Sequence, residues 1–262
     1  MNRRRWIIAG VVAWALAIAG LGLWSYANDP PTARDQTSIA DGLPVVDEAL
    51  GRIYSALDQQ GSVSVLGGYT RTEVSCRVTS AREGTRFVRK LTVFVGTGTE
   101  PAALDRIKAA LPDGYQAAVT HTQSAHILTA DAGHFVALRG GLSLPGRLEF
   151  TADTGCRIQN AAVTEATPAS QNANRAPVQA VLDTLGATAK EWRTHRLTGP
   201  GCGALWTVEA VTAGDVAKAH ATVPASAIVL DADKVFAYRA GAAGVSLRTE
   251  DGSLVVSSTA GC

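Results

Sequence analysis

The sequence is poor in aromatic residues, methionine and cysteine, and it has no excess of either charge. Aromatic residues make up 6% of the chain, with one methionine and four cysteines. Lysine and arginine number 24 against 23 acidic residues, and without the three arginines at positions 3–5 the balance is 21 against 23. Nucleic-acid-binding surfaces concentrate basic residues. The near-neutral charge therefore argues against a nucleic-acid partner.

The sequence also lacks the short motifs that identify common catalytic sites. It contains no G-x-S-x-G, S-x-x-K or H-E-x-x-H pattern and no glycine-rich phosphate loop. The nearest approach is the turn formed by Gly96, Thr97 and Gly98 before an expected helix, where backbone amides could hold an anion. A plain strand-to-helix turn explains these residues equally well. No residue is predicted to be catalytic, and no cofactor is expected.

The N-terminal segment contains 18 consecutive uncharged residues, from Ile7 to Trp24. About 20 apolar residues cross a membrane as a helix, and preceding arginines favour a cytoplasmic N-terminus. We therefore expect residues 1–27 to anchor a single-pass protein in the lipid bilayer of the cell membrane, with the remaining chain outside. The alternative is a signal peptide cleaved after Ala27, which gives a secreted protein. Alanines at four-residue spacing in this segment would also permit a homodimer.

The rest of the chain contains an internal duplication. Residues 148–156 and 254–262 both end in Gly-Cys, and earlier blocks also align, with residues 134–139 over 234–239 and Pro112 over Pro224. Self-similarity at a long period indicates one structural unit used twice. The sequence therefore predicts two tandem repeats, with boundaries at 28–43 for a tether, 44–158 for the first repeat, 159–177 for a linker and 178–262 for the second repeat.

Hydrophobic periodicity predicts the fold of each repeat. Val46, Leu50 and Ile53 form one apolar helix face, whereas residues 87–96 alternate as in a strand. Each repeat gives short helices among runs of strands joined by hairpin-length connections. We therefore expect an α+β fold, with a transmembrane helix followed by two units whose helices pack on a mainly antiparallel sheet.

The four cysteines predict one disulfide in each repeat. A chain exported to an oxidising compartment pairs its cysteines, and four cysteines allow three pairings. The duplication selects Cys76 with Cys156 and Cys202 with Cys262, because a duplicated unit would carry its own bridge. The alternative of buried thiols or a metal site has less support, since no C-x-x-C pair occurs.

A group of histidines in the first repeat is the strongest candidate for ligand chemistry. If a hairpin turn follows Asp131, His126 and His134 could approach each other and, with Asp131, bind zinc or copper. His121 has odd parity and His126 even parity, which argues against one site for all three histidines. The second repeat has no matching histidines, so solvated side chains on a sheet face are the alternative.

These features together predict a binding or structural protein of the bacterial envelope that acts outside the cytoplasm, without catalysis, on an unidentified protein or envelope partner. The alternative is an extracytoplasmic hydrolase or metal-dependent enzyme that uses a cleft between the repeats. A cavity that gathered the histidines with a carboxylate of the second repeat would favour the enzyme. An exposed apolar patch would favour binding.

Overall fold

The structure, a computed structural model, describes residues 3–28, 38–57, 59–72, 75–79, 82–123, 125–160, 162–163, 171–199, 202–214, 216 and 223–261. The chain forms two compact units, Met1–Gln36 and Thr37–Cys262. Helix α1 (Arg3–Asn28) is the described part of the first unit. All strands in the described residues belong to the second unit.

The predicted membrane anchor is contradicted. In the part of the chain that the structure describes, no helix is long and apolar enough to cross a membrane. The prediction rested on the absence of charge between Ile7 and Trp24, but eight of those 18 residues are alanine or glycine, which add little apolar side-chain surface. The single-pass localisation fails with the anchor. The homodimer through this segment stays a prediction.

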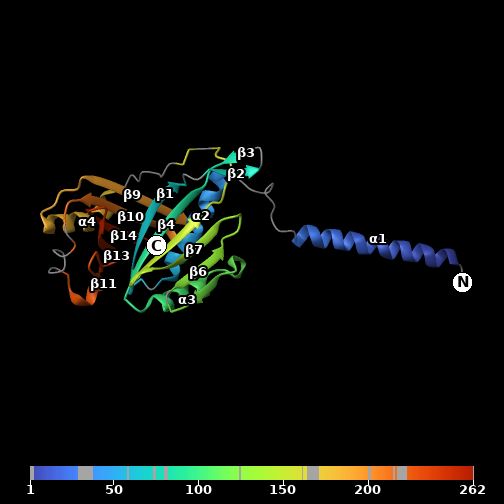
Figure 1. The fold of residues 1–262 in the computed structure, drawn as a ribbon, viewed down its shortest axis with the longest axis horizontal. Helices are drawn as coiled ribbons and strands as arrows, with labels where there is room; N and C mark the ends of the chain where they lie inside the picture. Colours follow the sequence, from blue (N-terminus) through green and yellow to red (C-terminus); the bar gives the residue numbers. More distant parts are fainter. Residues whose placement is uncertain are drawn as a thin grey trace. The chain divides into compact units, whose positions relative to one another are not determined.

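The second unit contains two six-stranded antiparallel sheets and one small hairpin (Figure 1). The first sheet has the spatial order β1 (Ser62–Arg71), β4 (Phe87–Val95), β8 (Arg147–Asp153), β7 (Ala137–Leu144), β6 (His126–Asp131) and β5 (Ala118–His121). The second sheet has the order β9 (Glu191–Gly199), β10 (Cys202–Thr212), β14 (Ser253–Gly261), β13 (Ala243–Glu250), β12 (Val235–Ala240) and β11 (Ile228–Ala232). The hairpin consists of β2 (Cys76–Thr79) and β3 (Arg82–Gly84).

The two large sheets have the same topology. In each sheet the first two strands in chain order are neighbours, and the remaining four return in reverse order. Both sheets also have a short 3-10 helix just before their third strand, η1 (Asp113–Tyr115) and η3 (Ala225–Ala227), preceded by Pro112 and Pro224. The sequence alignment of residues 134–139 with 234–239 is displaced by one strand. Residues 137–139 lie in β7, whereas residues 235–239 lie in β12, and the topology makes β12 the counterpart of β6.

The predicted α+β class is also wrong, because the structure is mostly β, with 47% strand and 30% helix. The periodicity located short helices correctly, but it gave no information about how much of the core the sheets form between themselves. Besides α1, the longer helices are α2 (Ile39–Ala56), α3 (Glu100–Ala110) and α4 (Gln171–Leu185). Helix α4 therefore begins inside the predicted linker. The sequence also predicts a short helix over residues 213–222, most of which lie outside the described residues.

Helix α2 begins earlier than the sequence suggested, inside the predicted tether. Ser38 and Asp41 form a capping box, which satisfies backbone groups at the helix start. The first helical residue, Ile39, is completely buried, and its N–H donates to the Ile158 carbonyl at 3.0 Å. This contact joins the start of α2 to residues that follow the first sheet.

Three hydrophobic clusters form the core. The largest packs α2 and α3 on the first sheet, and the second packs α4 on the second sheet. The third lies between the sheets and consists of Val63, Val65, Phe94, Leu230, Val235 and Ala237. We call it the intersheet cluster.

The edge strand β1 contacts several strands of the second sheet. The Leu66 N–H donates to Thr207 Oγ1 at 3.0 Å, and the Thr207 and Thr259 hydroxyls are 2.7 Å apart. A side chain at Gly244 would crowd this approach, since an added Cβ would lie 3.1 Å from Val63 Cγ1. The Thr207 hydroxyl therefore satisfies a backbone N–H of the edge strand β1, a kind of group that edge strands usually leave open.

Candidate functional site

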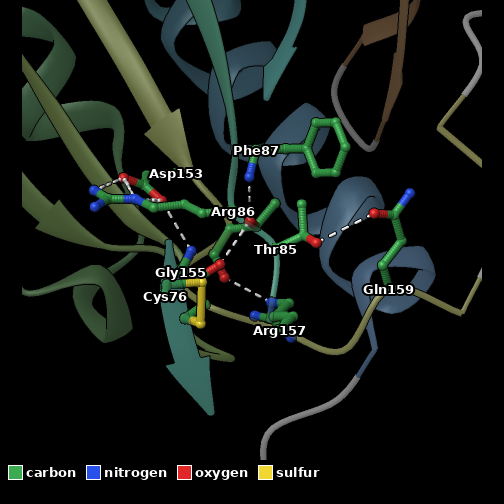
Figure 2. Close-up of a disulfide and its surroundings, with 10 residues drawn as sticks. Cys76, Thr85, Arg86, Phe87, Asp153, Gly155, Arg157 and Gln159 are labelled. Atoms are coloured by element: carbon green, nitrogen blue, oxygen red, sulfur yellow. Dashed lines mark hydrogen bonds and ion pairs between the residues drawn. A yellow bond between two sulfur atoms is a disulfide. The ribbon is translucent and has the colours of Figure 1, made fainter. Parts of the chain in front are cut away.

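The disulfide between Cys76 and Cys156 joins the small hairpin to the segment after β8 (Figure 2). Its cysteines are separated by 80 residues. Next to it, Thr85 and Arg157 exchange two backbone hydrogen bonds, at 2.7 and 2.9 Å. A Cβ on Gly84 would lie 2.6 Å from Cys156 Sγ, so the hairpin can approach the bridge only because this residue is glycine.

Charged groups beside the disulfide are paired. Arg86 Nε donates to both carboxylate oxygens of Asp153, at 2.8 and 2.7 Å, and this hydrogen bonding raises the pKa of Arg86 (Figure 2). Asp153 Oδ1 also accepts the Gly155 N–H at 2.9 Å. The carboxylate therefore has its partners within the fold, which is a structural arrangement rather than a reactive one.

Arg157 is completely buried and also has a structural role. Its Nε donates to the Thr154 carbonyl at 2.6 Å, and its Nη2 donates to the His134 carbonyl. Burial lowers the pKa of Arg157, and Asp41 opposes that effect. His134 thus contributes its backbone oxygen at a turn where its φ is +51°.

The predicted second bridge lies outside the described residues. Cys202 is the first residue of β10, but its side chain is not described, and Cys262 is not described at all. Backbone pairing brings Gly261 opposite Leu205.

The structure separates the predicted metal ligands. His126 begins β6 and Asp131 ends it, so their Cα atoms are about 17 Å apart. Asp131 Oδ1 accepts the Gly133 N–H at 2.8 Å in the turn that carries His134. His126, His134 and Asp131 are therefore not brought together.

His126 instead faces His121. The two residues are directly opposite each other in the β5–β6 hairpin, with their Nδ1 atoms 2.9 Å apart. The sequence-based prediction assumed that residues facing each other are both odd-numbered or both even-numbered. In this hairpin every odd-numbered residue faces an even-numbered one, so that assumption was wrong. His121 Nε2 lies 3.2 Å from Asp105 Oδ1, on helix α3. Asp105 could not be found from the sequence, because the packing of α3 on β5 is a tertiary contact. Among the described residues, no group of three or more His, Cys, Asp or Glu side chains is placed to hold a metal together.

A buried ionic cluster connects the two halves of the second unit. The Arg89 side chain is 0% exposed and donates to Asp47 Oδ1 at 2.6 Å, to the Gly67 carbonyl at 3.0 Å and to the Arg196 carbonyl at 2.8 Å. Tyr69 donates its hydroxyl to Asp47, and its ring lies 4.5 Å from the Arg89 guanidinium. Burial and the Asp47 charge raise the pKa of Tyr69, which keeps the phenol protonated as a donor.

A second buried ion pair lies in the second sheet. Arg248 Nη2 donates to Glu209 Oε1 at 2.5 Å, and Arg248 Nη1 donates to Ser257 Oγ at 3.2 Å. Burial lowers the pKa of Arg248, but Glu209 and Glu250 outweigh this effect and the net shift is upward. His195 Nε2 is 4.0 Å from Glu209 Oε2. Since both charges are compensated, this pair has a structural role rather than supplying a free acid or base.

A cleft of about 430 Å³ lies where α3, the ends of β1 and β4, and β11 meet. Its walls are mostly apolar or small and are formed by Leu57, Gln60, Gly61, Ser62, Val95, Gly96, Thr99, Ala102, Ala103, Arg106, Ile228 and Val229. We call it the intersheet cleft. Arg106 is its only charged lining residue, is exposed, and has no ion pair with any described residue.

The turn at residues 96–98 contributes to this cleft without forming an anion site. Thr99 Oγ1 donates to the Gly96 carbonyl at 2.6 Å, and Glu100, the first residue of α3, is buried and accepts the Gly146 N–H at 2.6 Å. A carboxylate already occupies the positive end of the helix. The plain-turn interpretation therefore fits this segment better.

Three further cavities have fully described linings. They measure about 330 Å³ beside α4, about 310 Å³ after α4 and about 560 Å³ beside the disulfide. No histidine lines any of these three cavities or the intersheet cleft. The only acidic residue among the four linings is Glu83, in the cavity beside the disulfide.

No protein-family model and no curated protein matches the chain. Among solved structures, it is similar to a DUF4853 family protein from Actinomyces odontolyticus ATCC 17982, with a TM-score of 0.39 and 14% sequence identity over 54% of this chain and 82% of that chain. At this level of similarity the comparison identifies neither a family nor a function.

Proposed function

We propose that this chain is a binding protein of an oxidising compartment outside the cytoplasm, and that its ligand enters the intersheet cleft. The ligand is an organic anion with an apolar body, either free or presented by a partner molecule. The observation that carries this proposal is a mainly apolar cleft of about 430 Å³ with one cation, Arg106, which has no ion pair with any residue that the structure describes. Ligand sites of this size are typically apolar, with a few polar groups that fix orientation.

Two further observations support the proposal. The disulfide between Cys76 and Cys156 is typical of chains that fold in oxidising surroundings. The cleft is also lined from both halves of the second unit, by Arg106 and Ala102 on one side and by Ile228 and Val229 on the other. Sites at such junctions are common for small ligands.

The chemistry of the cavities favours binding over catalysis. General acid–base catalysis needs a titratable side chain within reach of the substrate. The intersheet cleft is lined by no histidine, aspartate or glutamate, and the best-formed carboxylate pairs, at Asp47 and Glu209, are buried against arginines. The hydrolase or metal-enzyme alternative has no comparable support.

The proposal can be tested with 8-anilinonaphthalene-1-sulfonate, a fluorescent probe with an apolar body and one negative charge. We expect the full-length chain to bind this probe. Ala102→Trp should abolish binding of the probe in the cleft by filling the cavity, and Arg106→Gln should weaken binding roughly fivefold, equivalent to about 1 kcal/mol. Fluorescence titration measures all three.

Matched controls lie on the same helix outside the lining. Ala109→Trp makes the same substitution as Ala102→Trp, and Lys108→Gln also removes a cation, both at exposed positions; both variants should bind the probe like the wild type. The proposal fails if Ala102→Trp binds as well as Ala109→Trp while circular dichroism shows that both are folded.

A further inference from the structure

The β5–β6 hairpin brings two imidazole nitrogens together at the end of the first sheet. His121 and His126 flank the turn directly, and that turn is closed by hydrogen bonds between Thr122 and Ala125 at 2.8, 3.0 and 3.1 Å. The Nδ1 atoms of the two histidines lie 2.9 Å apart. The short, hydrogen-bonded turn fixes the two side chains on the same face.

From this arrangement we propose that His121 and His126 chelate a divalent transition-metal ion through their Nδ1 atoms, with Cu²⁺ and Ni²⁺ preferred over Zn²⁺. The site is separate from the intersheet cleft, and it does not depend on a ligand bound there. It also differs from the set of His126, His134 and Asp131 suggested by the sequence, because the structure keeps those three residues apart.

The distance between the nitrogens selects the metal geometry. Two ligands at about 2.05 Å from a metal are about 2.9 Å apart at a right angle and about 3.3 Å apart at a tetrahedral angle. The observed 2.9 Å, which is also the length of the hydrogen bond that the two rings share, is closer to the right angle. Square-planar and tetragonal sites with nitrogen and oxygen ligands are typical of Cu²⁺ and Ni²⁺, and Cu²⁺ also has the highest intrinsic affinity for such ligands. Tetrahedral Zn²⁺ would require the imidazoles to move apart.

Asp105 strengthens this assignment. Its Oδ1 lies 3.2 Å from His121 Nε2, so the ring can donate its Nε2–H to the carboxylate and leave the Nδ1 lone pair free for the metal. Metal-binding histidines usually donate their second nitrogen to a carboxylate or carbonyl in this way. Asp105 is thus a positioning residue.

The metal would remain partly open to solvent. The His121 side chain is 34% exposed and that of Asp105 is 62% exposed. A square-planar or tetragonal ion held by two imidazoles keeps at least two positions for water or for an oxygen or nitrogen ligand. Solvent exposure makes those positions accessible to an external ligand.

The proposal is tested by titrating the untagged full-length chain with Cu²⁺, Ni²⁺ and Zn²⁺ in isothermal titration calorimetry. We expect one equivalent of Cu²⁺, weaker Ni²⁺ and still weaker Zn²⁺. His121→Ala and His126→Ala should each weaken Cu²⁺ binding more than tenfold, because each removes the chelate. Asp105→Asn should weaken it about tenfold, the lower end of the range for such a partner.

The matched control is His134→Asn, at an exposed histidine whose positive φ asparagine tolerates. This variant should bind Cu²⁺ like the wild type. Electron paramagnetic resonance of the Cu²⁺ complex should show coupling to two imidazole nitrogens in the wild type and to one in His126→Ala. The proposal is overturned if Cu²⁺ does not bind at one equivalent, or if both alanine variants bind it with unchanged affinity and spectra.

Discussion

Arg89 shows how strongly one residue can connect distant parts of this chain. Its guanidinium reaches α2 through Asp47, β1 through the Gly67 carbonyl and β9 through the Arg196 carbonyl. A buried charge that loses its partner costs far more than an exposed one. Arg89 therefore matters for stability mainly because its removal would leave buried polar partners without a hydrogen-bond donor.

Arg89→Met keeps the volume but leaves the carboxylate of Asp47, which is largely buried, without its cation. We expect the free energy of unfolding to fall by about 3–5 kcal/mol in urea denaturation.

Two further variants separate charge pairing from packing. Arg139→Met changes an exposed arginine and should alter stability by less than about 0.5 kcal/mol. Adding Asp47→Leu to Arg89→Met removes both charges and should restore part of the loss. An Arg89→Met variant as stable as Arg139→Met would contradict this account.

At the scale of single elements, the small β2–β3 hairpin depends on its disulfide. The two strands pair only with each other, so the covalent bond and the contacts of Thr85 with Arg157 hold them in place. Closing a loop whose ends are 80 residues apart lowers the chain entropy of the unfolded state and so stabilises the folded state relative to it.

The corresponding prediction concerns removal of this bridge. The double variant Cys76→Ser with Cys156→Ser should lose about 2–5 kcal/mol of stability, with about 4.5 kcal/mol expected from loop entropy alone. Urea unfolding measures the loss. Ser75→Ala, next to the bridge, serves as a control and should be nearly neutral. A double variant with wild-type stability would contradict the view that the bridge stabilises the fold by restricting the unfolded chain.

Several elements carry clear local sequence signals. Thr99 and Pro101 marked the start of α3, and Asp251 with Gly252, both at positive φ, form the turn between β13 and β14. The start of α2 carries a local signal in the Ser38–Asp41 capping box, but contacts with distant residues also hold it: Ile39 binds Ile158, and Gly42 packs against Arg157.

In the candidate sites, too, some features could be predicted from the local sequence and others could not. The histidines that face each other could have been found by testing both possible registers of the hairpin, whereas parity along the chain discarded the correct pair. Asp105 and the lining of the intersheet cleft could not be found in this way. They join α3 to β5 and α3 to β11, contacts for which the sequence carries no local pattern.

At the scale of the whole molecule, the two sheets form one compact unit. The intersheet cluster, the Leu66–Thr207 hydrogen bond and the contacts of Arg89 all cross between them. Residues shared by both halves couple their stabilities. Similar topology in the two sheets therefore does not imply independent folding.

Native-state hydrogen exchange can test this coupling. We expect amides in β4 and β14 to share the same highest free energy of opening, and Leu230→Ala in the intersheet cluster to lower both by about 2–4 kcal/mol. Leu144→Ala, at an exposed leucine, should lower neither by more than about 0.5 kcal/mol. Loss of protection in β14 alone would show that the halves unfold separately.

The position of β1 against the second sheet also matters during synthesis. The ribosome releases β1 before any strand of the second sheet exists, so the hydroxyl of Thr207 is not yet present to accept the Leu66 N–H. An uncovered edge strand is a template for pairing with another chain. The nascent first half therefore passes through an interval of increased aggregation risk, which ends when more than a hundred further residues have been made and β10 can cover the edge.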